Sequence, residues 1–262
     1  MVGLKWWQMP LISYRSWLVV RRNLMVFKKT WLTNIGFNFI EPLLYLTALG
    51  LGLGAYVKEI QGLPYIQWIA PGLIASSAMW ATAIETTYDS FMRMKYQRIY
   101  HAIAATPISL EEVVVGEMLF GTFKSLLYGS VFLLVIFIAG LVPAATALLV
   151  PLVLVISGLI FAELGITWTG LVPKTDHFSY FFTLIITPMF LFGGIFFPLE
   201  GMPAVVQAVA WLTPLYHSVQ LIRSLVLGQY SWLLFGHAAW LATFAVIFFR
   251  IPLFLVRKKL VQ

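Results

Sequence analysis

Long apolar runs that carry little charge constrain this chain more than any other feature. A bilayer core about 30 Å thick requires about 20 apolar residues for one helical crossing. Five runs reach that length, at 32–56, 66–91, 113–141, 144–171 and 232–256. A sixth run, at 179–197, is shorter and uncharged. The pattern predicts an all-α membrane protein with six transmembrane helices.

The amount of charge excludes several classes of protein. Only 10% of the 262 residues are charged and 61% are apolar, whereas an ordinary soluble domain has about a quarter charged and about half apolar residues. A soluble enzyme, a nucleic-acid-binding domain and a disordered chain are therefore excluded for the whole chain. The net charge of +7 does not indicate a nucleic-acid partner, because the basic residues sit in short segments between apolar runs.

The positions of lysine and arginine predict the orientation, because cytoplasmic segments of membrane proteins are enriched in them. Fourteen of the seventeen fall on one side of this scheme, in 1–31, 93–98, 174 and 250–259. Lys58 and Arg223 fall on the other side, and Lys124 lies within a span. We expect a multi-pass membrane protein with both termini cytoplasmic. Basic residues spread through the first thirty positions also argue against a cleaved signal peptide.

An amphipathic pattern covers residues 10–29. Four apolar residues recur at spacings of three and four and share one helical face: Trp17, Val20, Leu24 and Phe27. Basic residues occupy the other face, so the helix suits the surface of an anionic inner leaflet. Contact with a cytoplasmic partner is the alternative for its additional apolar residues. We divide the chain into a cytoplasmic segment, 1–31, and a membrane domain, 32–262.

The loop between the second and third runs predicts a short helix between two fixed ends. Residues 99–105 favour a helix, Pro107 stops it, and Ser109 with Glu112 forms a capping box for the next span. A tight turn shielded by lipid headgroups is one interpretation. Docking of another protein better explains the apolar residues that we expect to be exposed there: Ile99, Tyr100 and Ile103.

Three charges are predicted to lie well inside the spans: Glu41, Lys124 and Glu163. A charge at the bilayer centre costs several kcal/mol unless it is paired. Lys124 and Glu163 have similar depth, so we expect them to pair, with Glu41 as an alternative partner of Lys124. A structural ion pair and a substrate pathway are both open interpretations. Glu85 and Glu117 are expected nearer the cytoplasmic ends of their spans.

The segment 198–230 consists of apolar pieces that are too short to cross a bilayer. Prolines stand where short helices would begin. We therefore expect two re-entrant or interfacial helices on the outer side, between the fifth and sixth spans. They are interpreted either as a cap on the bundle or as a gate, because irregular backbone at membrane depth is tolerated where it lines a cavity.

No motif for catalysis or nucleotide binding is present. The sequence has no cysteine, no P-loop, no His-Glu-x-x-His and no Gly-x-Ser-x-Gly. The chain is therefore not expected to be an enzyme or to bind a metal or cofactor itself.

Several motifs, in order along nearly the whole chain, are similar to those of one family. They are Glu41-Pro-Leu-Leu-Tyr45, Gly50-Leu-Gly-Leu-Gly54, Pro71-Gly-Leu-Ile-Ala-Ser-Ser-Ala-Met79, Arg98-Ile-Tyr-His-Ala-Ile-Ala-Ala-Thr-Pro107, Val114-Val-Gly-Glu117, Pro188-Met-Phe-Leu-Phe-Gly-Gly-Ile-Phe-Phe-Pro198 and Thr213-Pro-Leu-Tyr-His217. The chain resembles the permease subunits of type-2 ABC exporters (ABC-2), especially the nodulation-factor export permeases (NodJ-like).

The resemblance implies a dimer of permeases with two cytoplasmic ATPases that carry ATP and Mg, and export of an amphipathic substrate. That substrate would be a lipo-oligosaccharide, glycolipid, polysaccharide or drug. It implies a coupling helix that docks on the ATPase: Gln97, Arg98, Ile99, Tyr100, His101, Ile103 and Ala104. It implies an outer gate: Pro198, Pro203, Pro214, Tyr216 and Arg223. Candidate substrate-path aromatics are Phe37, Tyr45, Trp80 and Tyr88.

Two other functions are open at this point. An ion-coupled secondary transporter or channel would use Glu41, Lys124 and Glu163 as a relay. The short apolar cytoplasmic helix has no purpose in such a protein. A membrane enzyme acting on lipids is disfavoured, because no acid–base or metal cluster is apparent.

Overall fold

The computed structural model describes the backbone of residues 12–261 and the side chains of 12–31 and 40–260. Its longer helices are α1 (Ser16–Thr47), α2 (Tyr65–Ile84), α4 (Leu110–Ile138), α5 (Val150–Leu171), α9 (Pro214–Leu227), α10 (Leu233–Phe248) and α11 (Arg250–Val261). Its shorter helices are α3 (Ile99–Ala104), α6 (Phe178–Phe181), α7 (Thr187–Phe192) and α8 (Ala204–Trp211). A hairpin pairs β1 (Glu59–Ile60) antiparallel with β2 (Leu63–Pro64).

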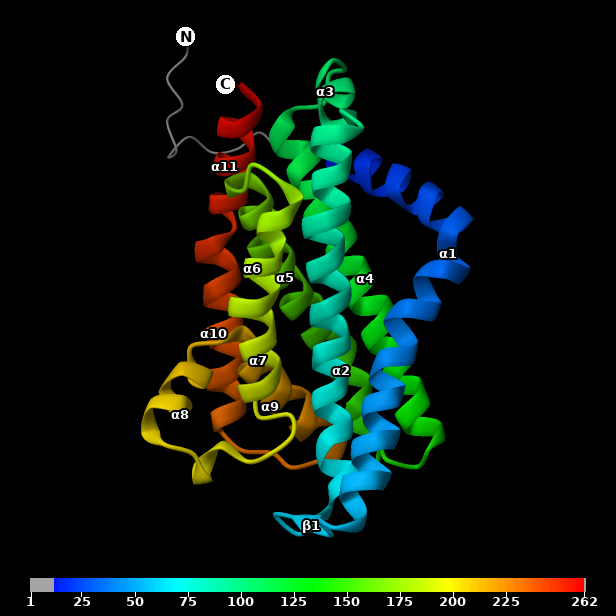
Figure 1. Ribbon diagram of the computed structural model, residues 1–262, viewed down its shortest axis with the longest axis vertical. Coiled ribbons are helices and arrows are strands. Elements are labelled where there is room, and N and C mark those ends of the chain that lie inside the picture. Colours follow the sequence, from blue (N-terminus) through cyan, green and yellow to red (C-terminus); the bar gives the residue numbers. More distant parts are fainter. Residues whose placement is uncertain (1–11, 262) are drawn as a thin grey trace.

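Single helical turns of other pitch join these elements. The wider π-type turns are η1 (Ala48–Gly52), η3 (Glu85–Asp89), η4 (Met92–Tyr96) and η7 (Phe182–Ile186). The tighter 3₁₀ turns are η2 (Leu53–Ala55), η5 (Ala145–Leu149), η6 (Thr175–His177) and η8 (Leu199–Gly201). The long helices run roughly parallel, with α3 and the end of α11 at one end of the bundle and the β1 hairpin at the other (Figure 1).

Three helical segments within the described part of the chain are long and apolar enough to cross a membrane: Leu110–Ile138, Ala145–Leu171 and Leu233–Leu260. The apolar part of the first predicted span is the shorter stretch Ile40–Ala55. The predicted run 179–197 is divided among α6, η7 and α7. The molecule is therefore a helical membrane bundle, and the count of six spans stays a prediction.

Small residues allow α4, α5 and α2 to pack closely. A Cβ atom added at Gly158 of α5 would lie 2.5 Å from Cβ of Ser125 on α4. One added at Gly165 would lie 2.0 Å from Oγ1 of Thr86 in η3. Missing side chains at membrane interfaces let helix backbones approach and increase van der Waals contact. These glycines therefore set the spacing of the three helices that carry most of the charged side chains described below.

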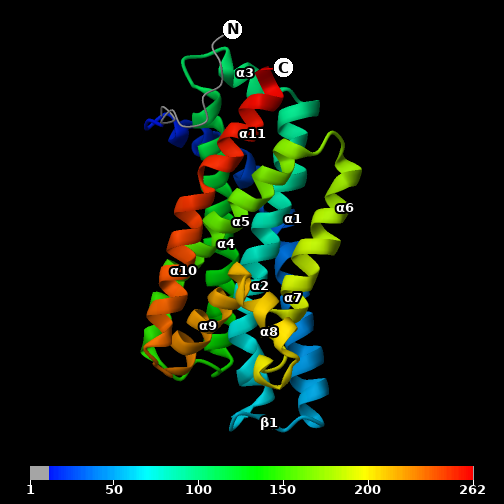
Figure 2. The same ribbon diagram turned by 90° about the vertical axis from the view of Figure 1, so that its left-hand side faces the viewer.

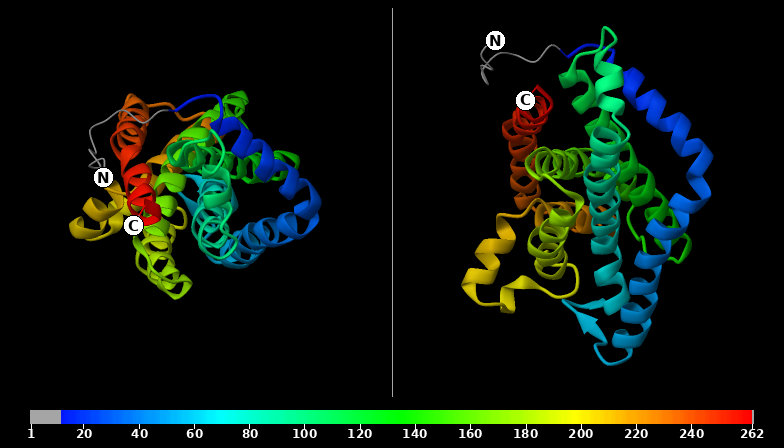
Figure 3. Two further views of the ribbon diagram at one scale, coloured as in Figure 1. Left: turned by 90° about the horizontal axis from the view of Figure 1, so that it is seen from above. Right: turned by 45° about the horizontal axis from the view of Figure 1, so that its top comes forward.

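The helix α1 crosses the predicted boundary at residue 31 without interruption. Its first half stands away from α2, whereas its second half runs beside α2 (Figure 3). Val19 and Val20 are buried, but Trp17 is 58% exposed. Trp17 and Val20 therefore do not share a buried face. The rotation of this segment is set by the close packing of Ser16 and Val19 against Gly116.

The segment after α7 folds back at the end of the bundle that carries the hairpin (Figure 2). Pro203 directly precedes α8, Pro214 begins α9, and the hydroxyl of Thr213 accepts a hydrogen bond from the Tyr216 amide. The charge count implied that Arg223 lies on a solvated outer loop, but the structure places it elsewhere. It is buried and donates to the carbonyl oxygens of Gly194, at 2.8 Å, and Trp68, at 3.3 Å.

Candidate functional site

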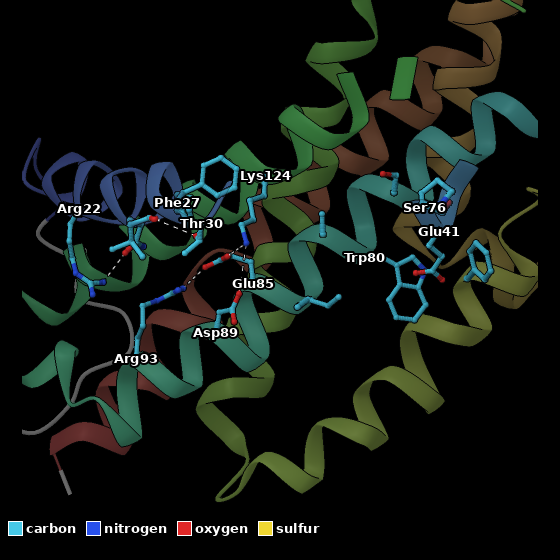
Figure 4. Close-up of a pocket in the computed structure, with 18 of the residues that line it drawn as sticks. Arg22, Phe27, Thr30, Glu41, Ser76, Trp80, Glu85, Asp89, Arg93 and Lys124 are labelled. Carbon is cyan, nitrogen blue, oxygen red and sulfur yellow. Dashed lines mark hydrogen bonds and ion pairs between the residues drawn. The ribbon is translucent and has the colours of Figure 1, made fainter. Parts of the chain in front are cut away.

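A cavity of about 750 Å³ opens between α1, α2, α4 and α7. It runs from the first half of α1, which stands away from α2, to the middle of the bundle (Figure 4). Its two ends differ in chemistry. One end is lined by charged side chains from α1, the extension of α2 and α4, and the other is lined mainly by aromatic and small side chains.

The charged end is a network of buried ion pairs. The Arg93 guanidinium contacts Glu85 Oε1 and Glu117 Oε2, each at 2.5 Å. Lys124 Nζ contacts the second carboxylate oxygen of Glu85, and Asp89 lies 3.8 Å from it. Figure 4 shows Glu85 between Arg93 and Lys124. Within this network, Glu85, Glu117, Arg93 and Lys124 each have a partner of opposite sign, which offsets part of the cost of their desolvation.

Sequence spacing explains why these residues meet. Glu85, Asp89 and Arg93 are four residues apart along the continuation of α2, so they lie near one face. Glu117 and Lys124 are seven apart on α4 and share a face as well. This periodicity of charge was available in the sequence and would have identified Asp89 and Arg93, which the predicted site omitted.

The expected pair of Lys124 with Glu163 is wrong. Lys124 instead contacts Glu85, and its Nζ lies 5.8 Å and 5.9 Å from the ring centres of Phe120 and Phe27. Glu163 is fully buried, and neither of its carboxylate oxygens has a hydrogen-bond partner within the described structure. Similar depth in the bundle therefore did not bring these two charges into contact.

The aromatic end contains two of the four predicted substrate-path residues. Tyr45 and Trp80 line the cavity with Phe190, and the ring centres of Tyr45 and Phe190 are 5.4 Å apart. Glu41 lies beside the Trp80 ring and not beside Lys124 (Figure 4). The side chain of Phe37 lies outside the described residues.

Tyr88 does not line this cavity. Its ring stacks on Phe182 at 5.6 Å and meets the Phe178 ring edge-on at 4.9 Å. Its place on η3 turns Tyr88 towards α6 and η7, whereas Glu85 and Asp89 turn towards the cavity, and the role of Tyr88 in a substrate path stays a prediction.

The predicted docking helix is present as α3, with one difference. Tyr100 is fully buried, and its hydroxyl is 2.6 Å from the Ser90 hydroxyl. It anchors the helix to the bundle and is not an exposed docking residue, because it packs in the apolar cluster of Phe91, Met94, Phe178 and Val256. Ile99 and Ile103 are partly buried. Exposed residues surround them: Gln97, Arg98, His101 and Ala104.

Specific backbone and capping geometry defines both ends of the segment that contains α3. Arg98, just before α3, has the left-handed backbone angle φ of 52°. Ser109 and Glu112 form the capping box of α4. The segment before α1 also reaches this loop, because Arg15 donates to the Pro107 carbonyl at 2.5 Å and Ser13 donates to Glu112. The loop and the N-terminal segment therefore form one surface at this end of the molecule.

The described residues include no group of three or more His, Asp or Glu side chains placed to hold a metal ion. The charged network combines carboxylates with an arginine and a lysine, which compete with any cation for the same oxygens. The cavity thus joins a charged end to an aromatic end.

Comparison with known proteins places these features in one family. Residues 14–227 match the family model described as ABC-2 type transporter. The chain is 38% identical over 248 residues to Nodulation protein J of Rhizobium leguminosarum bv. viciae, covering 94% of this chain and 96% of that protein. It is 34% identical over 254 residues to Nodulation protein J of Bradyrhizobium diazoefficiens, covering 97% of each. It is 25% identical over 238 residues to the inner membrane transport permease YadH of Escherichia coli, covering 90% of each.

Proposed function

Because the chain belongs to the ABC-2 type transporter family, we propose that it is the permease subunit of an ATP-driven exporter in a bacterial inner membrane. Members of this family are transport subunits and not enzymes. The proposal includes six membrane spans, cytoplasmic termini, a second permease copy and a separate cytoplasmic ATPase that binds ATP and Mg.

The division of the cavity into a charged and an aromatic end carries the proposal for the cargo. A charged or hydroxyl-rich head suits the end formed by Glu85, Asp89 and Arg93, and a sugar ring or acyl chain suits Tyr45, Trp80 and Phe190. An amphipathic cargo occupies both ends at once. Lipo-oligosaccharides, glycolipids, polysaccharides and amphipathic drugs have this character.

In the proposed mechanism, α3 couples the ATPase to the bundle. Tyr100 fixes α3 to the helical extension of α2 through Ser90, and that extension also carries Glu85, Asp89 and Arg93. A movement of α3 driven by the ATPase would therefore shift the charged end of the cavity. At the opposite end, α8 and α9 would form the outer gate, where Arg223 links α9 to the backbone of α2.

Co-purification and one substitution test this proposal. A tagged chain extracted in mild detergent should bring down a P-loop ATPase in equal amounts. Ile103→Glu should abolish ATP-dependent transport of dye-labelled lipid or sugar probes in vesicles while the ATPase remains bound, because a charge is placed in the coupling contact. Ile103→Val is the matched control and should transport normally. Transport by Ile103→Glu with the ATPase bound would show that α3 is not the coupling helix.

An ion-coupled transporter or channel is the second candidate, and the buried carboxylate of Glu163 without a described partner is the observation in its favour. The ion pair of Lys124 with Glu85 counts against a relay of Glu41, Lys124 and Glu163. Transport that persists without the ATPase but stops with an uncoupler would support this candidate over the exporter.

A further inference from the structure

Three polar groups at the aromatic end of the cavity lack partners. The hydroxyl of Ser77 and the indole N–H of Trp80 are buried and make no hydrogen bond within the described structure. Glu41 lines the same cavity; it is an exposed residue, and its carboxylate has no partner within the described structure. Buried polar groups are nearly always hydrogen-bonded, so two unsatisfied donors on residues that line one cavity require an explanation.

The neighbouring Ser76 shows that a serine hydroxyl of α2 can form a hydrogen bond within the helix itself. The Ser76 hydroxyl donates to the carbonyl oxygen of Leu73, 3.1 Å away, which is a common arrangement for serine within a helix. The Ser77 hydroxyl has no such bond although the residue is only 3% exposed. The Ser77 donor therefore stays unpaired in a residue that lines the cavity.

The three groups come from two sides. Ser77 and Trp80 are three residues apart on α2 and so lie on one face. Glu41 lies on α1 and lines the same cavity as Trp80 (Figure 4). The residues of the wall thus offer two donors, Trp80 Nε1–H and Ser77 Oγ–H, and a carboxylate acceptor, Glu41.

We propose that Glu41, Ser77 and Trp80 form a hydrogen-bonding subsite for a neutral group of the cargo that has one donor hydrogen and one acceptor oxygen, as a secondary amide or a hydroxyl does. The donor hydrogen bonds the Glu41 carboxylate, and the two lone pairs of the oxygen accept from Trp80 and Ser77. The inference rests on the proposed transport function, because it assigns part of the cargo to the cavity.

The charge and hydrogen-bonding capacity of the wall exclude other ligands. A phosphate or carboxylate would face the Glu41 carboxylate at close range and be repelled. An ammonium group would pair with Glu41 but leave the two donors of α2 unsatisfied. A plain alkyl chain would leave the two buried donors unsatisfied, and sites built around buried polar groups reject analogues that cannot bond them.

A pair of small amides tests the subsite. N-Octylacetamide has an amide N–H and a carbonyl oxygen, and N-methyl-N-octylacetamide differs in lacking the N–H. The full-length permease in lipid nanodiscs should bind the radiolabelled secondary amide at least about fivefold more tightly, the ratio expected for one hydrogen bond. Equilibrium dialysis against empty nanodiscs corrects for partition into lipid.

Substitutions assign the bonds. Glu41→Met should abolish the preference for the secondary amide. Trp80→Phe, which keeps an aromatic ring, should lower the affinity for both amides about fivefold, and Ser77→Ala should do the same. In both variants the preference for the secondary amide should persist. Ser76→Ala is the matched control and should leave both affinities unchanged, because its hydroxyl is already bonded within α2.

Equal binding of the two amides by the unsubstituted protein would overturn the subsite without any variant. A preference that survives Glu41→Met would do so as well. Failure of the subsite and failure of the proposed function are distinguishable, because the binding assay contains no ATPase or ATP. A permease that prefers the secondary amide but does not transport with its ATPase would keep the subsite and lose the exporter function.

Discussion

Lys124 and Glu85 form an ion pair whose side chains are only 6% and 2% exposed. Removing one partner of a buried pair leaves the other charge uncompensated, which costs about 3–5 kcal/mol when no second partner exists. Glu85 keeps Arg93 as a second partner. We therefore expect Lys124→Met to lower the melting temperature of the purified protein by about 5 °C, measured by tryptophan fluorescence on heating.

A double-substitution cycle identifies the true partner of Lys124. The effects of Lys124→Met and Glu85→Gln should be strongly non-additive, because the second change removes the charge that the first leaves unpaired. The effects of Lys124→Met and Glu163→Gln should add, since these residues are not in contact. Additivity of the first pair together with coupling of the second would contradict the ion pair with Glu85 and restore the pair expected from depth alone.

For single residues, the sequence reliably predicts contacts within one helical turn, but it does not predict which residue of another helix a charged side chain contacts. The capping box of Ser109 and Glu112 could be predicted because both residues belong to one helical turn. The partner of Lys124 could not, because it depends on the rotation of α4 against α2. The free donors of Ser77 and Trp80 also depend on packing, since nothing in the sequence distinguishes Ser77 from Ser76.

Among the helices, the contact of α4 with α5 depends on the absence of a side chain at Gly158. An added Cβ would lie 2.5 Å from Ser125 Cβ, so Gly158→Ala forces the helices apart. Overpacking of this kind costs about 1–3 kcal/mol, and we expect a lower melting temperature than for the unsubstituted protein.

Gly236 in α10 supplies the control for this prediction. A Cβ atom there meets no other atom within 4 Å, and alanine favours a helix over glycine. Gly236→Ala should therefore leave the melting temperature unchanged or raise it. If Gly158→Ala unfolds at the same temperature as Gly236→Ala, the close contact between α4 and α5 does not exist.

The elements show why sequence periodicity predicts some helices better than others. The stretches within 113–141 and 144–171 carry no charge except at Glu117, Lys124 and Glu163, and they become most of α4 and all of α5. The run 179–197 contains Pro188, Gly193 and Gly194, and the chain there changes from α6 through a π-type turn to α7 and ends in a left-handed Gly194. Apolar length alone carries no information about such breaks.

In the whole molecule, the candidate coupling surface and the hairpin lie at opposite ends (Figure 2). The end with α3 is held together by contacts between distant parts of the chain. Arg257 of α11 pairs with Glu111 at the start of α4, and Lys259 donates to the carbonyl oxygen of Thr169, 2.7 Å away. The cavity extends from this end towards the middle of the bundle, as expected for entry of cargo from the cytoplasmic side.

This polarity predicts which residues face which side of the membrane. The sequence contains no cysteine, so single cysteines can be labelled without background. Glu59 in β1 and Gln229 after α9 are exposed at one end, and Ala105 after α3 is exposed at the other. In spheroplasts, a membrane-impermeant maleimide should react with Glu59→Cys and Gln229→Cys, whereas Ala105→Cys should react only after the membrane is opened.

The labelling pattern also tests the assignment of α3 to a cytoplasmic partner. Addition of the purified ATPase to inverted vesicles should slow the labelling of Ala105→Cys, because the docked protein covers α3, and should leave Glu59→Cys unaffected. Reaction of Ala105→Cys in intact spheroplasts would place α3 on the outer face, where no ATPase can reach it. Coupling through α3 would then be impossible, and the excess of basic residues at this end would need another explanation than the positive-inside rule.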